Sequence, residues 1–196
     1  MNVKGRREEY AETTRHAIVQ AAVERFAAGG FARTTIDEVA DAARVTKGAV
    51  YHHFQDKSEL FEAAFVVMEE RLLVRVDEGV QGIEDPWELM ATGIDLFLAE
   101  CCEADFRRIA IQEAPAALGW ARWKEIEERY FLGVVKAVLD ALASRGVIGA
   151  QTGDLSARLL LAAMSEAGVA VADAVSPEAA RQQAAALLMQ FVAGLR

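Results

Sequence analysis

The chain has 196 residues, of which 53% are hydrophobic and three are proline, and its formal net charge is −9. This composition excludes a largely disordered protein and predicts a sizeable buried core in one ordinary domain or two small ones. Strong helix formers are abundant and no run of β-branched residues is long enough for a strand, so the predicted fold class is all-α.

The compartment is indicated by what the sequence lacks. The first ten residues are charged and are not followed by an apolar stretch, so we expect no secretory signal. The most apolar stretch, 159–175, is interrupted by polar residues and does not reach the ~18 apolar residues of a membrane span. Cys101 and Cys102 are adjacent, which suits neither an ordinary disulfide nor a zinc site. We expect a cytoplasmic protein with no membrane partner, metal or cofactor.

Charge is unevenly distributed along the chain. Residues 1–57 hold nine Lys or Arg and eight Asp or Glu, a net charge of +1. Residues 58–196 hold twelve Lys or Arg and twenty-two Asp or Glu, a net charge of −10. All three histidines lie in the first part, and the segment 42–55 contains basic residues but no acid. The acidity therefore belongs to the second part, and the first part keeps a local basic surface that can meet phosphate.

Three helical patterns follow one another near the N-terminus. The first, 14–28, carries an apolar stripe and ends at a Gly-Gly pair. The second begins at Thr35, where the sequence TIDE forms a capping box. The third is very short, 47–53, and begins after Thr46 as its N-cap. Two short helices joined by a tight turn and braced by a longer one are typical of a helix-turn-helix, which offers its second helix to the major groove of DNA.

The remaining sequence predicts a helical body with six further helices, about nine in all. A second capping arrangement at 56–59 opens a long helix that runs to residue 76, and turn signals divide the rest. The other five helices are expected at roughly 86–102, 105–114, 119–145, 154–174 and 177–194. We therefore predict an N-terminal three-helix DNA-binding unit, residues 1–57, joined to a ligand-binding and dimerisation body, residues 58–196.

Residues 34–65 resemble the signature of the TetR family of bacterial transcriptional regulators, in the sequence TTIDEVADAARVTKGAVYHHFQDKSELFEAAF. The shared features are the capped second helix, a short third helix with Gly48 and then Tyr51, an aromatic residue after that helix, and the start of the fourth helix. One departure is Ala49, where the family often has a hydroxyl residue. The resemblance implies a DNA-binding domain followed by a ligand-binding and dimerisation domain.

The resemblance also implies which residues line the DNA. They are Thr34, Thr35, Thr46, Lys47, Gly48, Ala49, Tyr51, His52 and Lys57. On the outward face of the third helix, Lys47 suits a phosphate or a guanine edge, and Tyr51 and His52 have polar tips for phosphate or base contacts. Gly48 lets the backbone come close to DNA. The expected partner is a double-stranded, pseudo-palindromic operator bound by a homodimer.

The density of aromatic residues between 86 and 145 predicts a largely apolar pocket for a small-molecule effector. The candidate lining residues are Met90, Phe97, Phe106, Ile109, Trp120, Trp123 and Tyr130, with Glu113 as the polar contact. The surplus of acid in this part of the chain favours a neutral or cationic ligand.

The last two helices are expected to form the dimer. The segment 159–174 is apolar on nearly all sides, and its small residues, such as Ala162 and Gly168, would let helices approach closely. The segment 184–195 adds further apolar residues. Since one chain of this size can hardly cover a helix that is apolar all round, we expect a symmetric four-helix interface.

These patterns predict a regulator, in the form of a repressor that a small molecule releases from its operator, and not an enzyme. Two alternatives stay open. A helical enzyme with a vestigial helix-turn-helix would be favoured by a buried acid-base pair with strongly shifted pKa values in a body pocket. A DNA-binding protein without a ligand would be favoured by a body without a cavity.

Overall fold

The computed structural model describes residues 3–149 and 153–195, and all regular structure in these residues is helical, which confirms the predicted fold class. The elements are α1 (Val3–Arg33), α2 (Ile36–Ala42), α3 (Lys47–His53), α4 (Lys57–Gly79), α5 (Pro86–Glu100), α6 (Ala104–Phe106), the π-helix η1 (Arg107–Glu113), α7 (Ala114–Leu118), α8 (Trp120–Ser144), α9 (Asp154–Ala172) and α10 (Pro177–Ala193). Because α6, η1 and α7 follow one another without a break, these ranges form nine helical segments, as expected.

The first helix is longer than the sequence pattern predicted. It begins at Val3 instead of residue 14. Thr13 and Thr14 do not cap a helix start but donate their hydroxyl hydrogens to the carbonyls of Glu9 and Tyr10, at 2.9 and 2.8 Å. Such bonds to the preceding turn place both threonines inside a helix, which explains the difference.

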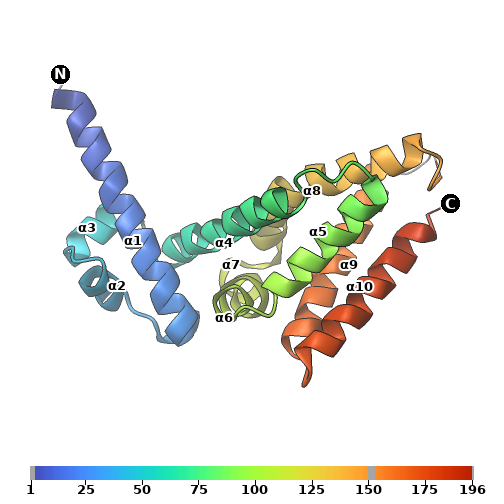
Figure 1. The fold of residues 1–196 in the computed structure, drawn as a ribbon. Coiled ribbons are helices and arrows are strands. Elements are labelled where there is room, and N and C mark those ends of the chain that lie inside the picture. The colour runs from blue at the N-terminus through green and yellow to red at the C-terminus, as the bar shows by residue number, and fades with distance from the viewer. Residues whose placement is uncertain (1–2, 150–152, 196) are drawn as a thin grey trace.

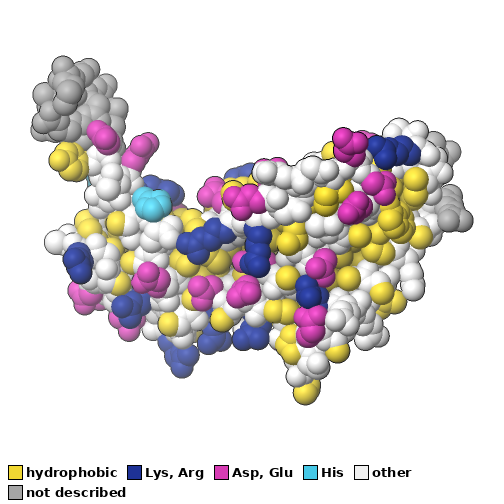
Figure 2. Space-filling model, viewed as in Figure 1, with side chains coloured by type: hydrophobic (Ala, Val, Ile, Leu, Met, Phe, Trp, Pro, Cys, Tyr) yellow, Lys and Arg dark blue, Asp and Glu magenta, His cyan; other side chains and the backbone are white. Residues whose placement is uncertain are grey.

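Helices α1, α2 and α3 lie together at one end of the molecule, and α4 leads from them into the body (Figure 1). In the body α5, α8, α9 and α10 pack beside one another. On the face drawn in Figure 2, hydrophobic side chains gather over these body helices, whereas acidic and basic side chains are interspersed over the rest of that face.

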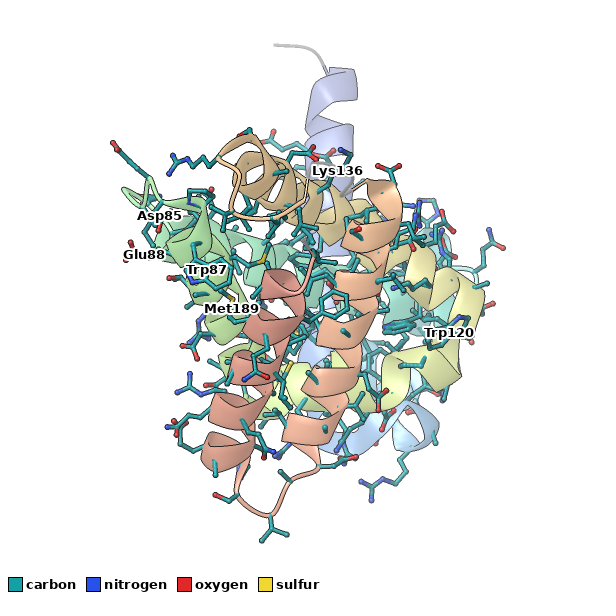
Figure 3. The ribbon with its side chains drawn as sticks, turned by 90° about the vertical axis from the view of Figure 1, so that its right-hand side faces the viewer. Asp85, Trp87, Glu88, Trp120, Lys136 and Met189 are labelled. Carbon is teal, nitrogen blue, oxygen red and sulfur yellow. The ribbon has the colours of Figure 1, made fainter. Side chains whose placement is uncertain are left out.

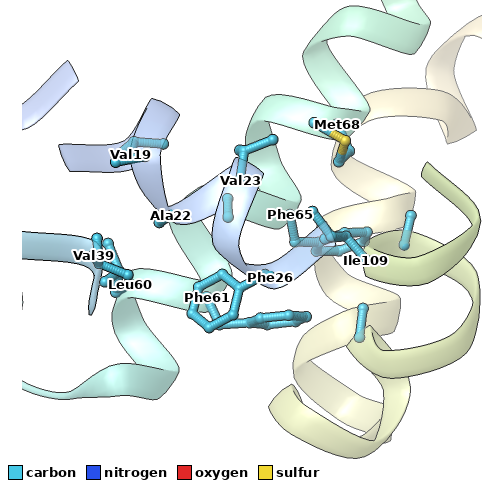
Figure 4. Packing of buried hydrophobic residues seen from close by; sticks show 14 of the residues in the cluster. Val19, Ala22, Val23, Phe26, Val39, Leu60, Phe61, Phe65, Met68 and Ile109 are labelled. Carbon is cyan, nitrogen blue, oxygen red and sulfur yellow. The ribbon is translucent and has the colours of Figure 1, made fainter. Parts of the chain in front are cut away.

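One hydrophobic core joins the N-terminal unit to the body. In Figure 4 the side chains of α1 face those of α4, and Ile109 of η1 lies beside them. The ring of Phe61 packs edge-on against Phe26 and Phe31, with centroids 5.0 and 5.2 Å apart. A second core joins α5, α8, α9 and α10. The expected domain boundary after residue 57 therefore falls at the start of α4, a helix that both parts share.

Helix α1 is interrupted at Gly30, which has φ 77° and ψ 167°. This backbone conformation is open almost only to glycine. A Cβ atom here would lie 2.3 Å from Oε1 of Glu113 in η1, and the other carboxylate oxygen of Glu113 accepts a hydrogen bond from the backbone N–H of Phe31. The glycine pair ends the regular part of the helix as predicted, and one more turn follows up to Arg33.

We predict that Gly30→Ala lowers the free energy of unfolding by about 1–3 kcal/mol, because alanine at a positive φ is strained and its methyl group displaces Glu113. Gly133→Ala is the matched control, since no atom lies within 4 Å of a Cβ there and α8 is regular around it. The control is expected to gain up to ~1 kcal/mol. Denaturant unfolding measures both, and equal effects would contradict the role given to Gly30.

Candidate DNA-binding face and ligand cavity

The expected capping box at the start of α2 is present. The hydroxyl oxygen of Thr35 accepts a hydrogen bond from the backbone N–H of Glu38 at 3.2 Å, and the carboxylate of Glu38 accepts one from the backbone N–H of Thr35 at 2.8 Å. The hydrogen bond from the backbone N–H of Thr35, together with one that its hydroxyl donates at 2.9 Å, lowers the pKa of the Glu38 carboxyl. Helix α2 therefore begins at a fixed residue and holds the rest of the helix-turn-helix in register.

The turn between α2 and α3 is closed by two backbone hydrogen bonds. Val45 N–H donates to the carbonyl of Ala40 at 3.0 Å, and Arg44 N–H donates to that of Asp41 at 3.1 Å. This is a Schellman motif, in which Arg44 takes the left-handed conformation with φ 56°. Glycine is the usual residue at such a position, so the sequence indicated a break here but not its geometry.

Helix α3 presents one face to the protein and the other to solvent. Val50 and, just beyond the helix, Phe54 are buried. On the opposite face Lys47 and His52 are exposed, and 49% of Tyr51 is accessible. The outward face is thus the one that the sequence pattern predicted, and none of the described residues covers it.

Lys47 has a partner within the chain. Its ammonium donates a hydrogen bond to the carboxylate of Asp37 in α2 at 2.8 Å, which raises the pKa of the lysine. Both side chains are more than half exposed, and an ion pair of this kind contributes little stability. Lys47 can therefore exchange Asp37 for a phosphate at little cost.

Gly48 has no structural reason to be glycine. A Cβ atom there would meet only the hydroxyl oxygen of Thr46, at an ordinary 3.8 Å, and the residue lies in a regular helix. The protein would gain helix stability from alanine at this position. The missing side chain leaves the surface of α3 open at this position, which is compatible with the expected close approach of DNA.

Two of the expected DNA-contacting residues have structural roles in this fold. Thr34 is buried, with 4% of its surface accessible, and donates its hydroxyl hydrogen to the carbonyl of Arg25 at 3.0 Å, which corrects its expected place on the outer surface. The ammonium of Lys57 donates to the carbonyls of Phe31 and Thr34, at 2.8 and 3.1 Å, and lies 4.5 Å from the ring centroid of Phe31. Lys57 thus closes the C-terminal end of α1, and a phosphate contact for it stays a prediction.

Thr46 and Ala49 also belong to the framework of the motif. Thr46 is the N-cap of α3, as predicted, and its hydroxyl oxygen accepts a hydrogen bond from the backbone N–H of Ala49 at 3.2 Å. Thr46 is exposed and Ala49 is half-buried. Both lie at the N-terminal end of α3, next to Lys47 and Gly48.

The body holds a cavity of about 230 Å³ that is lined by residues of every element from α4 to α9. Five of the eight residues expected to bind the effector line it: Met90, Phe97, Phe106, Trp120 and Trp123. The walls are mainly apolar, as predicted. They also include Leu72 and Val76 of α4 and Val80 just beyond it, which were not expected.

The other three candidates lie outside the cavity. Ile109 is fully buried in the core shared with α1 and α4. Glu113, the expected polar contact, binds the N–H of Phe31 instead, and Tyr130 donates its hydroxyl hydrogen to Glu70 at 3.1 Å. For Ile109 and Glu113 the reason is local, because residues 107–113 form a π-helix whose side chains recur at a wider spacing than in the expected α-helix.

The polar end of the cavity consists of residues that the sequence reasoning missed. Glu127 accepts hydrogen bonds from the ammonium of Lys124, at 2.7 Å, and from the hydroxyl of Ser165, and all three residues border the cavity. Beside them lies Glu69 of α4, also at the cavity wall. Burial and the neighbouring Glu127 raise the pKa of Glu69 to about 8. The available signal was a glutamate within the apolar stripe Phe65–Leu72, where a solvated residue is not expected.

Both halves of the chain match known family models. Residues 18–64 match the model of bacterial regulatory proteins, tetR family, and residues 87–195 match that of the tetracyclin repressor-like C-terminal domain. The chain is 27% identical over 163 residues to the TetC protein of transposon Tn10 from Escherichia coli, covering 82% of this chain and 81% of that protein. It is 47% identical over 58 residues to the transcriptional regulator TtgR of Pseudomonas putida, covering 30% of this chain and 28% of that one.

Solved structures agree with these sequence matches. A TetR-family transcriptional regulator from Pectobacterium atrosepticum superposes with a TM-score of 0.83 at 27% identity, covering 95% of this chain and 96% of that one. RolR in complex with resorcinol has the same fold, with a TM-score of 0.78 at 19% identity over 96% of this chain and 91% of its own. With the C-terminal family model matched over more than half of the chain, and the N-terminal one over its helix-turn-helix, the protein belongs to the TetR family of transcriptional regulators.

Proposed function

We propose that this regulator is a cytoplasmic homodimeric repressor, which binds a pseudo-palindromic operator through α3 and leaves it when a small molecule occupies the body cavity. The observation that carries the proposal is the double role of α4. Phe61 and Phe65 of this helix pack in the core of the DNA-binding unit, whereas Leu72 and Val76 of the same helix line the cavity. A ligand that displaces the second half of α4 therefore moves the base of the helix-turn-helix.

The π-helix η1 supplies a second connection between cavity and DNA-binding unit. Ala110 and Ile111 line the cavity, and Glu113 of the same element binds the N–H of Phe31 at the break of α1. A ligand can release DNA only by binding the DNA-incompetent arrangement more tightly. A hundredfold loss of operator affinity requires about 2.7 kcal/mol of such preference.

Comparison with solved structures supports a small aromatic effector. RolR, which shares the fold, is known in complex with resorcinol. In the present chain Trp120, Trp123, Phe97 and Phe106 supply aromatic walls to a cavity in the body. A body with such a cavity does not favour the alternative of a DNA-binding protein without a ligand.

The buried carboxyl pair is the one observation that favours an enzyme. Burial and the charge of Glu127 raise the pKa of Glu69, one member of the pair, to about 8, whereas the enzyme alternative required a buried pair with shifted pKa values. Glu127 is already held by Lys124 and Ser165, and the matching N-terminal family model and TtgR are those of regulators. We therefore assign the pair to ligand binding. Chemical change of an effector during incubation with the protein would favour the enzyme.

Selection from a random duplex library, followed by a screen of small aromatic compounds, tests the function. We expect enrichment of a symmetric sequence with half-sites about one helical turn, ~34 Å, apart. Because Trp120 and Trp123 line the cavity, compounds that enter it are expected to change tryptophan emission and to release the selected operator. A folded dimer that enriches no symmetric sequence at low salt would refute operator binding, and compounds that change emission without releasing DNA would refute the coupling.

The DNA-binding face is tested separately by Gly48→Ala. The substitution is expected to leave the free energy of unfolding unchanged or to raise it by up to ~1 kcal/mol. Operator affinity should fall at least tenfold, about 1.4 kcal/mol, since the added methyl group stands between the helix and the groove. Fluorescence anisotropy with the selected duplex measures the affinity, and Gly133→Ala, remote from α3, is the control. Unchanged affinity in the Gly48 variant would remove α3 from the interface.

Helices α9 and α10 carry the surface that we assign to the dimer. They lie side by side on the end of the molecule away from the DNA-binding unit (Figure 3). Their outer faces expose large apolar residues, with 70% of Leu155, 51% of Leu159, 56% of Leu187 and 38% of Phe191 accessible. In the described part of the chain α9 is also the one helix long and apolar enough to cross a membrane. Packing against α8 and α10, and in a dimer against a partner, accounts for that composition.

One detail of the expected interface was wrong. Gly168 does not face a partner but is buried against α5 of its own chain, where a Cβ atom would lie 2.9 Å from the sulfur of Cys101 and 3.1 Å from the ring of Phe97. Its small size brings α9 close to α5 within one subunit. Substitution there would disturb the fold, so it cannot test the dimer.

Leu187→Glu tests the interface more cleanly. A charge at this exposed position costs an isolated subunit little but would be buried without a partner in the proposed four-helix interface, so the variant should sediment as a folded monomer. Val74→Glu, on the equally exposed outer face of α4, should remain dimeric. Sedimentation velocity distinguishes the two, and a normal dimer of the Leu187 variant would place the interface elsewhere.

A further inference from the structure

Glu69 is a buried carboxyl group without a hydrogen-bond or salt-bridge partner in the part of the chain that the structure describes. Only 5% of the residue is accessible, and within the described residues its carboxyl forms neither a hydrogen bond nor an ion pair. In the described part of the chain, every side-chain nitrogen or oxygen that is completely buried forms a hydrogen bond. The carboxyl oxygens of Glu69 form none, so they are not completely buried and must border the cavity that the residue lines. Since a buried polar group without a partner is costly, this carboxyl is available to a ligand.

Among the described residues, no positive charge is available to Glu69. Lys124, the cation at the polar end of the cavity, is already paired with Glu127 at 2.7 Å. The titratable groups that interact with Glu69 are Glu127 and Tyr130 of α8 and Cys101 at the end of α5, and none of them carries a positive charge. With Lys124 and Glu127 compensating each other, an ionised Glu69 adds an uncompensated negative charge to the wall, where the exposed Glu166 of α9 is a further acidic residue.

The rest of the cavity suits an aromatic cation. Phe97, Phe106, Trp120, Trp123 and Phe131 border it, and the faces of such rings attract cations as well as flat apolar groups. A cavity of about 150 Å³ holds benzene, so about 230 Å³ is sufficient for a molecule of one or two rings with a short chain.

We propose that the cavity binds a compact arylalkylammonium ion, whose ammonium group donates to Glu69 while its ring lies among the aromatic side chains. This inference rests on the proposed function, for which it names the chemical class of the effector. The ammonium supplies the partner and the charge that Glu69 lacks, and the position of Glu69 on α4 brings the ligand's charge onto the helix that continues into the DNA-binding unit.

Binding of such a cation is coupled to loss of a proton. In the empty protein the pKa of Glu69 is raised to about 8, so the carboxyl is mostly protonated at pH 7. A bound ammonium favours the carboxylate and expels that proton. The ionised fraction of Glu69 rises as the pH increases from 6 to 8, so the affinity for the cation should rise at least about tenfold over this range.

Titration calorimetry of the full-length dimer with two matched probes tests the proposal. The probes are 2-(1-naphthyl)ethylamine, which is protonated at these pH values, and the corresponding alcohol, 2-(1-naphthyl)ethanol. We expect the amine to bind at least tenfold more tightly than the alcohol at pH 8. Its affinity should fall toward pH 6, and buffers of different ionisation enthalpy should reveal proton release at pH 7. The affinity of the alcohol should change little with pH.

Glu69→Gln should remove the preference for the amine and its pH dependence while leaving the affinity for the alcohol within about threefold, since the cavity walls are unchanged. Glu78→Gln removes the same charge from an exposed position of α4 and is expected to behave like the wild type.

Thermal unfolding without ligand gives an independent measurement of the same carboxyl. A glutamate whose pKa is raised in the folded state stabilises the protein fully below its ordinary pKa, and that stability is lost as the pH rises through 8. The melting temperature of the wild type should therefore fall more than that of Glu69→Gln between pH 5 and pH 9.

Equal binding of amine and alcohol, or a Glu69→Gln variant that keeps the preference for the amine, would overturn the proposed ligand class. If the alcohol then released the operator, the ligand-responsive function would still stand. Conversely, pH-dependent binding of the amine that leaves the operator bound would support the ligand class and refute the coupling to DNA. Failure of both probes to bind would overturn the ligand class. The ligand-responsive function would then be tested by operator release in the wider screen of aromatic compounds.

Discussion

A single apolar stripe along α4 is the feature on which the rest of the structure depends. Over 23 residues this helix buries side chains at helical spacing, and the stripe meets two different partners. Its first half, from Leu60 to Phe65, completes the core around Phe26 of α1. Its second half, from Glu69 to Val76, forms one wall of the cavity. A helix that belongs to the core at one end and to the cavity wall at the other cannot tilt at one end without disturbing the other, because packed interiors do not deform continuously.

The contact between Glu113 and Phe31 adds a directional element to this packing. Hydrophobic contacts along α4 tolerate small sliding, whereas a hydrogen bond from a backbone N–H to a carboxylate fixes position and angle. It joins a π-helix, whose backbone departs from regular α geometry, to Phe31, which directly follows a glycine whose backbone no other residue adopts easily. The two irregular elements meet where cavity and DNA-binding unit come together, as is common for strained backbone at functional sites.

Sequence reasoning succeeded where the determining interactions are local. The capping box at Thr35 and the N-cap at Thr46 involve residues three positions apart, so the starts of α2 and α3 could be read directly. It failed where contacts between segments distant in the sequence determine the position of a residue. The orientation of Gly168 depends on α5, and the place of Ile109 depends on the π-helical spacing. The position of Glu69 at a cavity wall depends on all the elements from α4 to α9 that form the cavity together. The fold and the outward face of α3 could be predicted, whereas the polar end of the cavity required the packed structure.

The pairing of the lysines near α3 within the protein has a consequence for how the regulator finds its operator among the other sites of the genome. Lys47 is paired with Asp37, the ammonium of Lys57 is held by backbone carbonyls, and residues 1–57 carry a net charge of only +1 beside a body of −10. Affinity for random DNA grows with the number of phosphates that a protein neutralises. We therefore expect a DNA-binding part with so low a net charge to hold random DNA weakly and to leave the many competing sites quickly. Its residence on the operator would then come from groove contacts and fit, and few molecules would be lost to the rest of the genome.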